Sequence, residues 1–120
     1  MFEIVFYESA SGRSQIDDFI KDLDQRAETD KTAKMELKQI LFFLDLLAQG
    51  GKLIGTKYAK QLEGPIWELT PGNNRILFFA WTGRRFVLLH QFRKKTQKTP
   101  QREIDQAKRE MTDWLRRNPK

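Results

Sequence analysis

Four cationic side chains lie within six residues in the C-terminal third of the sequence, at Arg93, Lys94, Lys95 and Lys98. Like charges at this spacing repel one another, so a compact anionic ligand is their natural partner. The run follows an apolar segment, 85–92, that is typical of a buried strand. It precedes Thr99 and Pro100, which are typical of a helix N-cap and first helical position. A solvated or disordered basic arm is the alternative, but these ordered flanks favour a site on a rigid scaffold.

Other basic residues stand next to the strands that we expect before this run. Lys57 and Lys60 precede the first of these strands, and Arg75 opens the second. Because antiparallel neighbours bring strand ends together, these side chains and the cationic run can form one pocket. Such a pocket can grip phosphates on both sides of a scissile bond and stabilise a pentacoordinate phosphorane. RNA would supply its own 2′-hydroxyl as nucleophile, so this chemistry requires neither metal nor cofactor.

Glu68 and His90 are the candidates for proton transfer, because both fall on expected strands beside this pocket. Each has a structural alternative. Arg75 can pair with Glu68 across strands, and His90 lies in an apolar run where a hydrogen-bonded core histidine fits equally well. Trp67 and Trp81 could stack on bases, although we expect both in the core.

Charge is distributed unevenly along the 120 residues. Residues 1–83 carry 10 Lys and Arg against 12 Asp and Glu, whereas residues 84–120 carry 12 against 4. This concentration favours a polyanion such as nucleic acid, with an acidic protein partner as the alternative. The chain has one histidine, no cysteine, no Gly-rich phosphate loop and no Gly-x-Ser-x-Gly elbow. These absences exclude two-histidine nuclease, thiolate-metal, kinase, dehydrogenase and serine-hydrolase sites within one chain.

The N-terminal segment has no feature typical of a signal peptide, and no apolar run approaches the ~20 residues needed to span a bilayer. We therefore expect a cytoplasmic protein without membrane association. Its length and composition predict a single domain over residues 1–120 that buries a core without disulfides or a structural metal.

The pattern of apolar residues and turns predicts an α+β domain in the order βααβββα. The expected elements are a strand over 2–7, a helix of about three turns around 16–23, a helix from Asp30 to Gly50-Gly51, strands over 66–70, 75–82 and 85–92, and a helix over 100–117. A loop that carries Lys52, Lys57 and Lys60 is expected before the first of the last three strands. Short connections between these strands imply an antiparallel meander, with the helices packed on one face of the sheet.

The second expected helix carries more apolar surface than one packed face requires, because Phe42, Phe43 and Leu46 widen its stripe. We expect these side chains in the core. An apolar surface offered to another chain is the alternative.

Four stretches occur in a fixed order along the chain. They are KQLEGPIWEL at 60–69, NRILFF at 74–79, LLHQFRKKTQKTP at 88–100 and EIDQA at 103–107. Together they resemble the RelE/ParE superfamily of toxins from bacterial type II toxin–antitoxin systems, in its HigB-like branch. The resemblance covers about residues 57–110, and its most specific part is Lys-Lys-Thr-Gln-Lys-Thr-Pro. It implies the RelE-like microbial RNase fold.

The resemblance also implies a function. Such toxins are ribosome-dependent endoribonucleases that cut messenger RNA in the A site of the 70S ribosome without a metal or cofactor. A cognate antitoxin, commonly a helix-turn-helix protein, neutralises the toxin, and the complex commonly represses its own operon. Operator DNA would therefore be contacted only through the antitoxin.

Matching the motifs places Arg75 on the arginine that contacts the scissile phosphate in these toxins. Lys94 and Lys95 fall on the basic pair that supplies a transition-state cation. Glu68 falls where RelE carries a lysine, and no tyrosine follows the basic run at the place where RelE uses one. These two departures leave the general acid and base open.

Two other functions compete with the nuclease. ParE-like relatives share the fold but poison DNA gyrase, and they generally lack the convergent basic set that this chain retains. A simple basic RNA-binding or scaffold protein would explain the charge but not the ordered motifs. We therefore predict catalytic roles for Arg75, Lys94, Lys95, Glu68 and His90, and RNA contacts from Lys57, Lys60, Arg93 and Lys98.

Overall fold

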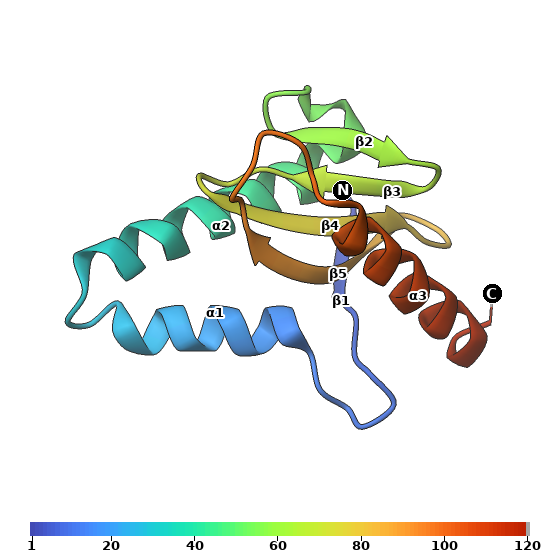
Figure 1. Ribbon diagram of the computed structural model, residues 1–120, viewed down its shortest axis with the longest axis horizontal. Coiled ribbons are helices and arrows are strands. Elements are labelled where there is room, and N and C mark those ends of the chain that lie inside the picture. Colours follow the sequence, from blue (N-terminus) through green and yellow to red (C-terminus); the bar gives the residue numbers. More distant parts are fainter. Residues whose placement is uncertain (120) are drawn as a thin grey trace.

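A single mixed sheet organises the chain in the computed structural model, which describes residues 1–119 (Figure 1). Its strands are β1 Glu3–Phe6, β2 Ala59–Glu63, β3 Ile66–Leu69, β4 Asn74–Ala80 and β5 Arg85–Arg93, in the spatial order β1-β5-β4-β3-β2. The helices are α1 Gln15–Arg26, α2 Lys31–Gly50 and α3 Gln101–Arg117, with a 3₁₀ helix, η1 Gly51–Ile54, after α2. The α+β class predicted from the sequence is confirmed.

Local sequence explains where two of the helices begin and where α2 ends. The Ser14 hydroxyl caps α1 by accepting the Asp17 N–H at 3.1 Å. The Asp30 carboxylate caps α2, at the residue from which this helix is predicted. Gly51 ends α2 with a φ of +62°, a region that favours glycine. A Cβ there would lie 2.7 Å from the Phe2 ring, so this close approach also requires glycine.

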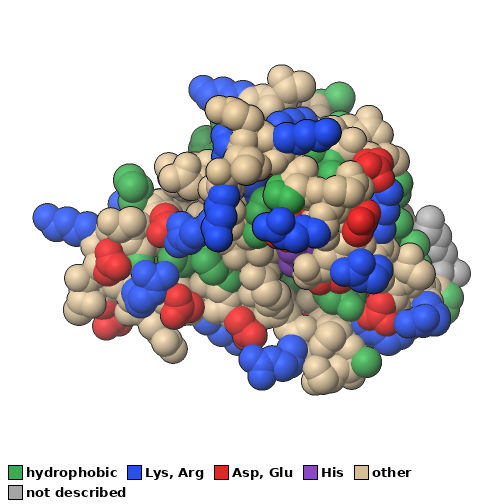
Figure 2. Space-filling view, viewed as in Figure 1, with side chains coloured by type: hydrophobic (Ala, Val, Ile, Leu, Met, Phe, Trp, Pro, Cys, Tyr) green, Lys and Arg blue, Asp and Glu red, His purple; other side chains and the backbone are tan. Residues whose placement is uncertain are grey.

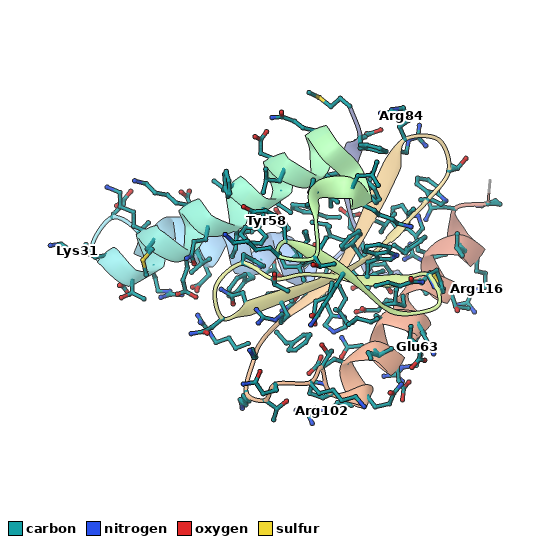
Figure 3. All side chains as sticks on the ribbon, turned by 90° about the horizontal axis from the view of Figure 1, so that it is seen from above. Lys31, Tyr58, Glu63, Arg84, Arg102 and Arg116 are labelled. Atoms are coloured by element: carbon teal, nitrogen blue, oxygen red, sulfur yellow. The ribbon has the colours of Figure 1, made fainter. Side chains whose placement is uncertain are left out.

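The helices cover both faces of the sheet, because side chains alternate along its central strands. One face packs against α1 and α2 through Ile16, Leu23, Ile40, Leu47, Ile76, Phe78 and Leu88. The other packs against α3 through Leu77, Phe79, Val87, Leu89, Ala107 and Trp114. Figure 3 shows α2 and α3 on opposite sides of the sheet. The prediction that the helices pack on one face is therefore wrong.

Two features of the sheet also differ from the prediction. The four strands from β2 to β5 form an antiparallel meander, but β1 pairs with β5 in parallel. The sheet is therefore mixed. In addition, β2 occupies part of the segment before β3 that we predicted as a loop. It is an edge strand with one buried apolar residue, Ala59, followed by the exposed Lys60 and Gln61, so its composition lacks the apolar alternation of a central strand.

A bulge in β5 decides which face of the sheet His90 occupies. Leu77 pairs with His90 and Phe78 pairs with Leu88, so Leu89 is an extra residue without a partner on β4. One extra residue reverses the alternation that follows it. His90 therefore lies on the α3 face, and Gln91 lies on the α1–α2 face, where its amide donates to Asn74 Oδ1 at 2.8 Å.

The apolar stripe of α2 is only partly buried. Phe43 packs against the core and against the Tyr58 ring, with 5.4 Å between ring centroids. Leu46 is half-buried, whereas Phe42 is 53% exposed, so the prediction of a core position is wrong for Phe42. Although α2 has 20 residues, no helix within residues 1–119 is long and apolar enough to cross a membrane.

Phe78→Ala should lower the free energy of unfolding by about 3–5 kcal/mol, because Phe78 is fully buried between the sheet and α1–α2. Phe42→Ala makes the same change at an exposed position and should cost less than about 1 kcal/mol. Denaturant unfolding of both variants measures the difference. Equal losses would contradict the placement of Phe78 in the core and of Phe42 at the surface.

Candidate active site

The cationic run forms a loop, residues Lys94–Pro100, that passes over the sheet between β5 and α3 (Figure 1). We call this segment the basic loop. Its residues line a small pocket together with Arg75 and Phe92. The pocket volume is about 10 Å³, close to what one water molecule or one hydroxyl group needs. The predicted site residues that the structure brings to this pocket are Arg75, Lys94, Lys95 and Lys98.

Among the residues that the structure describes, no carboxylate pairs with the lysines of the basic loop. Within residues 1–119, carboxylate oxygens lie within 4.0 Å of the ammonium groups of Lys21, Lys60 and Lys108, but not of Lys94, Lys95 or Lys98. Lys95 and Lys98 are exposed, and Lys94 is half-buried. Figure 2 shows Lys and Arg side chains gathered over the face that carries the basic loop and α3. This positive charge is therefore available to an external anion.

Backbone carbonyl groups hold Arg75 beside this loop. Its Nη1 donates to the carbonyl oxygens of Gly72, at 2.8 Å, and Asn74, at 2.7 Å. The side chain is 13% exposed, and in the described chain its Nε and Nη2 donate to no protein acceptor. A guanidinium that is fixed on one side and free on the other can donate to a phosphate oxygen.

Glu68 lies beneath the pocket with its carboxylate fully buried. Its Oε2 accepts a hydrogen bond from Thr99 Oγ1 at 2.5 Å, whereas its Oε1 has no donor within residues 1–119. Oε1 lies 3.7 Å from Lys60 Nζ and 4.0 Å from Arg75 Nε. The Arg75–Glu68 pair considered from the sequence is therefore a contact between charges without a hydrogen bond. Glu68 Oε1 therefore lies beside two cations but accepts no hydrogen bond from residues 1–119.

Lys60 lines a groove that lies beside this pocket. It stands directly opposite Glu68 on the edge strand β2. The groove has a volume of about 290 Å³, and Lys98 and Thr99 line both this groove and the pocket. Lys60 and Lys98 thus extend the positive surface along the edge of the sheet.

Two of the predicted RNA contacts lie outside both cavities. Lys57 is exposed, and its ammonium lies 5.6 Å from the centre of the Tyr58 ring. Arg93 Nη1 lies 2.7 Å from Glu36 Oε1 of α2, on the opposite face of the sheet from Arg75. The hydrogen bond from Arg93 holds the pKa of Glu36 below its usual value, although burial opposes this shift. Arg93 therefore ties β5 to α2 in this structure.

His90 is held between two carboxylates of α3. Its Nδ1 lies 2.6 Å from Glu110 Oε1, and its Nε2 lies 3.0 Å from Glu103 Oε1. Burial alone would lower the pKa of His90, but the hydrogen bonds and negative charges of Glu110 and Glu103 outweigh burial and raise it. Both ring nitrogens are engaged and the side chain is buried, so the structure does not bring His90 to the pocket.

Thr99 and the two glutamates of α3 were missed from the sequence. The sequence predicts Thr99 as the N-cap of α3, but Pro100 holds that position without a side-chain hydrogen bond, so the prediction is wrong. Its hydroxyl bonds to Glu68 instead. Glu103 and Glu110 are seven residues apart and therefore share one helix face with Ile104 and Ala107. Two acidic residues beside a buried apolar stripe were the signal in the sequence that α3 faces a basic side chain, which is His90.

Comparisons with known proteins identify a family and a weak structural likeness. The family model of phage-derived Gp49-like proteins matches residues 18–112. A chain in the YoeB-YefM complex from Staphylococcus aureus is similar at 13% sequence identity and a TM-score of 0.49, over 80% of this chain and 99% of that chain. A likeness this weak says nothing of function. No curated protein matches the chain significantly.

His90→Gln should lower the free energy of unfolding by about 1–3 kcal/mol at acidic pH, because it removes the imidazolium between Glu103 and Glu110. The pKa of His90 is raised above its ordinary value of 6.5. The stability gained from this group is therefore complete below pH 6.5 and is lost as the pH rises through the folded-state pKa. Denaturant unfolding of both proteins from acidic to alkaline pH measures the difference, and a pH-independent difference would contradict the buried imidazolium.

Proposed function

The chain belongs to the phage-derived Gp49-like family, a family of RelE-like toxins, and we propose on that basis that it is a ribosome-dependent endoribonuclease toxin. The observation that carries the nuclease proposal is the convergence on one pocket of Arg75 and three lysines that have no carboxylate partner in residues 1–119. Phosphoryl transfer needs little from a protein beyond positioning and stabilisation of negative charge. The finer placement in the HigB-like branch rests on the sequence 94–100.

In the proposed reaction, a 2′-hydroxyl of the message attacks the adjacent phosphorus, and the bond from phosphorus to the 5′-oxygen breaks. The products are a 2′,3′-cyclic phosphate and a 5′-hydroxyl. The free N–H groups of Arg75 donate to a non-bridging oxygen, while Lys94 and Lys95 add positive charge where the phosphorane becomes more negative. A donor of this kind lowers the barrier by about 2–4 kcal/mol.

Glu68 is the group that we propose as acceptor of the 2′-hydroxyl proton. Its Oε1 has no donor, and it lies 4.0 Å from Arg75 Nε, which would hold the phosphate. Oε1 is buried, so the hydroxyl reaches it through a rearrangement of side chains on binding. The proton for the leaving 5′-oxygen comes from water or from the ribosome, because both nitrogens of His90 are engaged.

The proposed partners follow from the toxin function. Messenger RNA on the 70S ribosome is the substrate, which places the reaction in the cytoplasm. A cognate antitoxin, of the helix-turn-helix type in the HigB-like assignment, neutralises the toxin and carries any contact with operator DNA. Lys60 and Lys98 line the groove beside the pocket, where they can hold phosphates that flank the scissile bond.

Expression without an antitoxin should arrest growth through loss of translated message. Primer extension on RNA from arrested cells should show new 5′ ends inside coding regions. Intact messages together with cleaved or supercoiling-defective DNA would contradict the nuclease and support gyrase poisoning. Arrest with both nucleic acids intact would favour a non-enzymatic RNA-binding protein.

Lys95→Ala should lower the cleavage rate on programmed ribosomes by about 30- to 1000-fold, the equivalent of about 2–4 kcal/mol, without a change in thermal stability. Lys95 is exposed and makes no ion pair with residues 1–119, so its loss costs the fold little. Lys38→Ala is the matched control, because Lys38 is an exposed lysine of α2, on the other face of the sheet. Equal rates for wild type and Lys95→Ala would place the catalytic cation elsewhere.

A further inference from the structure

Thr99 joins the end of the basic loop to the centre of the sheet. Its hydroxyl donates to Glu68 Oε2 at 2.5 Å, and the Glu68 side chain is 1% exposed. A Ser or Thr before a helix ordinarily caps it, but the N-cap of α3 is Pro100, which makes no side-chain cap hydrogen bond. The hydroxyl of Thr99 therefore bonds to a residue of the sheet and does not cap the helix that follows it.

This hydrogen bond makes the two oxygens of the Glu68 carboxylate unequal. Oε2 is occupied by Thr99, and Oε1 is the oxygen next to Lys60 and Arg75. Rotation of the carboxylate would exchange the two oxygens and break the bond to Thr99. Thr99 thus fixes the orientation that leaves Oε1 beside the cations, without a hydrogen-bond donor from residues 1–119.

The same bond anchors the basic loop. At its start, the Lys94 N–H donates to the Asn73 carbonyl at 2.8 Å. In its middle, the Thr96 hydroxyl donates to the Lys98 carbonyl, a contact within the loop itself. Within residues 1–119, Thr99 makes the one side-chain hydrogen bond from this loop to the sheet. Its loss would leave the loop tied to the sheet by backbone at its start and by the beginning of α3.

We propose that Thr99 is a positioning residue of the nuclease site, an assignment that rests on the proposed function. It holds the lysines of the basic loop at a fixed place above Arg75 and turns Glu68 Oε1 towards the reacting hydroxyl. Without the hydroxyl of Thr99 the charges remain, so attraction to RNA persists. Their placement around the transition state is lost, so the chemical step slows.

Thr99→Val tests the role, because valine has nearly the same shape as threonine and lacks the hydroxyl. The maximal single-turnover rate on programmed ribosomes should fall by about 10- to 100-fold, while the half-saturating toxin concentration changes less than about threefold. Trypsin should cut faster after the lysines of the basic loop, Lys94, Lys95 and Lys98. Thr99→Ser keeps a hydroxyl and should recover both properties. Thr112→Val makes the same change at an exposed position of α3 and should match wild type.

The outcomes separate this inference from the proposed function. If wild type cleaves message and Thr99→Val is equally fast and equally resistant to trypsin, the positioning role is overturned and the nuclease stands. If no variant cleaves message but Thr99→Val exposes the loop to trypsin, the nuclease is overturned and the anchoring of the loop stands. A slower chemical step with an unchanged loop would contradict anchoring. Should Thr99→Val fail to fold, Thr99→Ala removes the same hydroxyl with a smaller side chain.

Discussion

A buried negative charge at Glu68 sets the arrangement of everything around the pocket. Burying a carboxylate is unfavourable unless donors and cations compensate it, and here the compensation comes from three distant parts of the chain. Thr99 donates a hydrogen bond from the end of the basic loop, Lys60 stands opposite on β2, and Arg75 approaches from β4. The contacts that stabilise this charge in the fold therefore also bring together the cationic groups to which we assign phosphate binding. Compensation of the buried Glu68 carboxylate is therefore required both for the fold and for the arrangement of the site.

A second set of contacts, between His90 and two carboxylates, holds α3 in place on the same face of the sheet. His90 lies between Glu103 and Glu110, and Lys108 of α3 pairs with Glu63 of β2. The start of α3 and the end of β5 are thus both fixed, so the short basic loop spans two rigid supports. Its lysines can repel one another without unfolding the loop, because packing elsewhere in the domain offsets the unfavourable free energy of that repulsion. This explains how lysines without a carboxylate partner in residues 1–119 can be held in the ordered loop that we propose as the RNA site.

The sequence predicted the parts that depend on local pattern. Periodicity identified three helices and three of the four meander strands, and the short turns showed that Arg75 would lie near Lys94, Lys95 and Lys98. The bulge at Leu89 could not be seen, because one extra residue in a continuous apolar run leaves no mark on its composition. That bulge places His90 against α3. The edge strand β2, the parallel pairing of β1 and the partner of Arg93 depend on contacts distant in sequence, which local patterns do not encode.

The central claim is that this cationic pocket cleaves messenger RNA through the substrate's own 2′-hydroxyl. It is tested most directly in a reconstituted translation system with a message that carries a single 2′-deoxy nucleotide at the mapped cleavage position. The account predicts that the all-ribose message is cut to a 2′,3′-cyclic phosphate and a 5′-hydroxyl, and that the deoxy substitution abolishes the cut. Cleavage of the substituted message at the same bond, or a product with a 5′-phosphate, would contradict it.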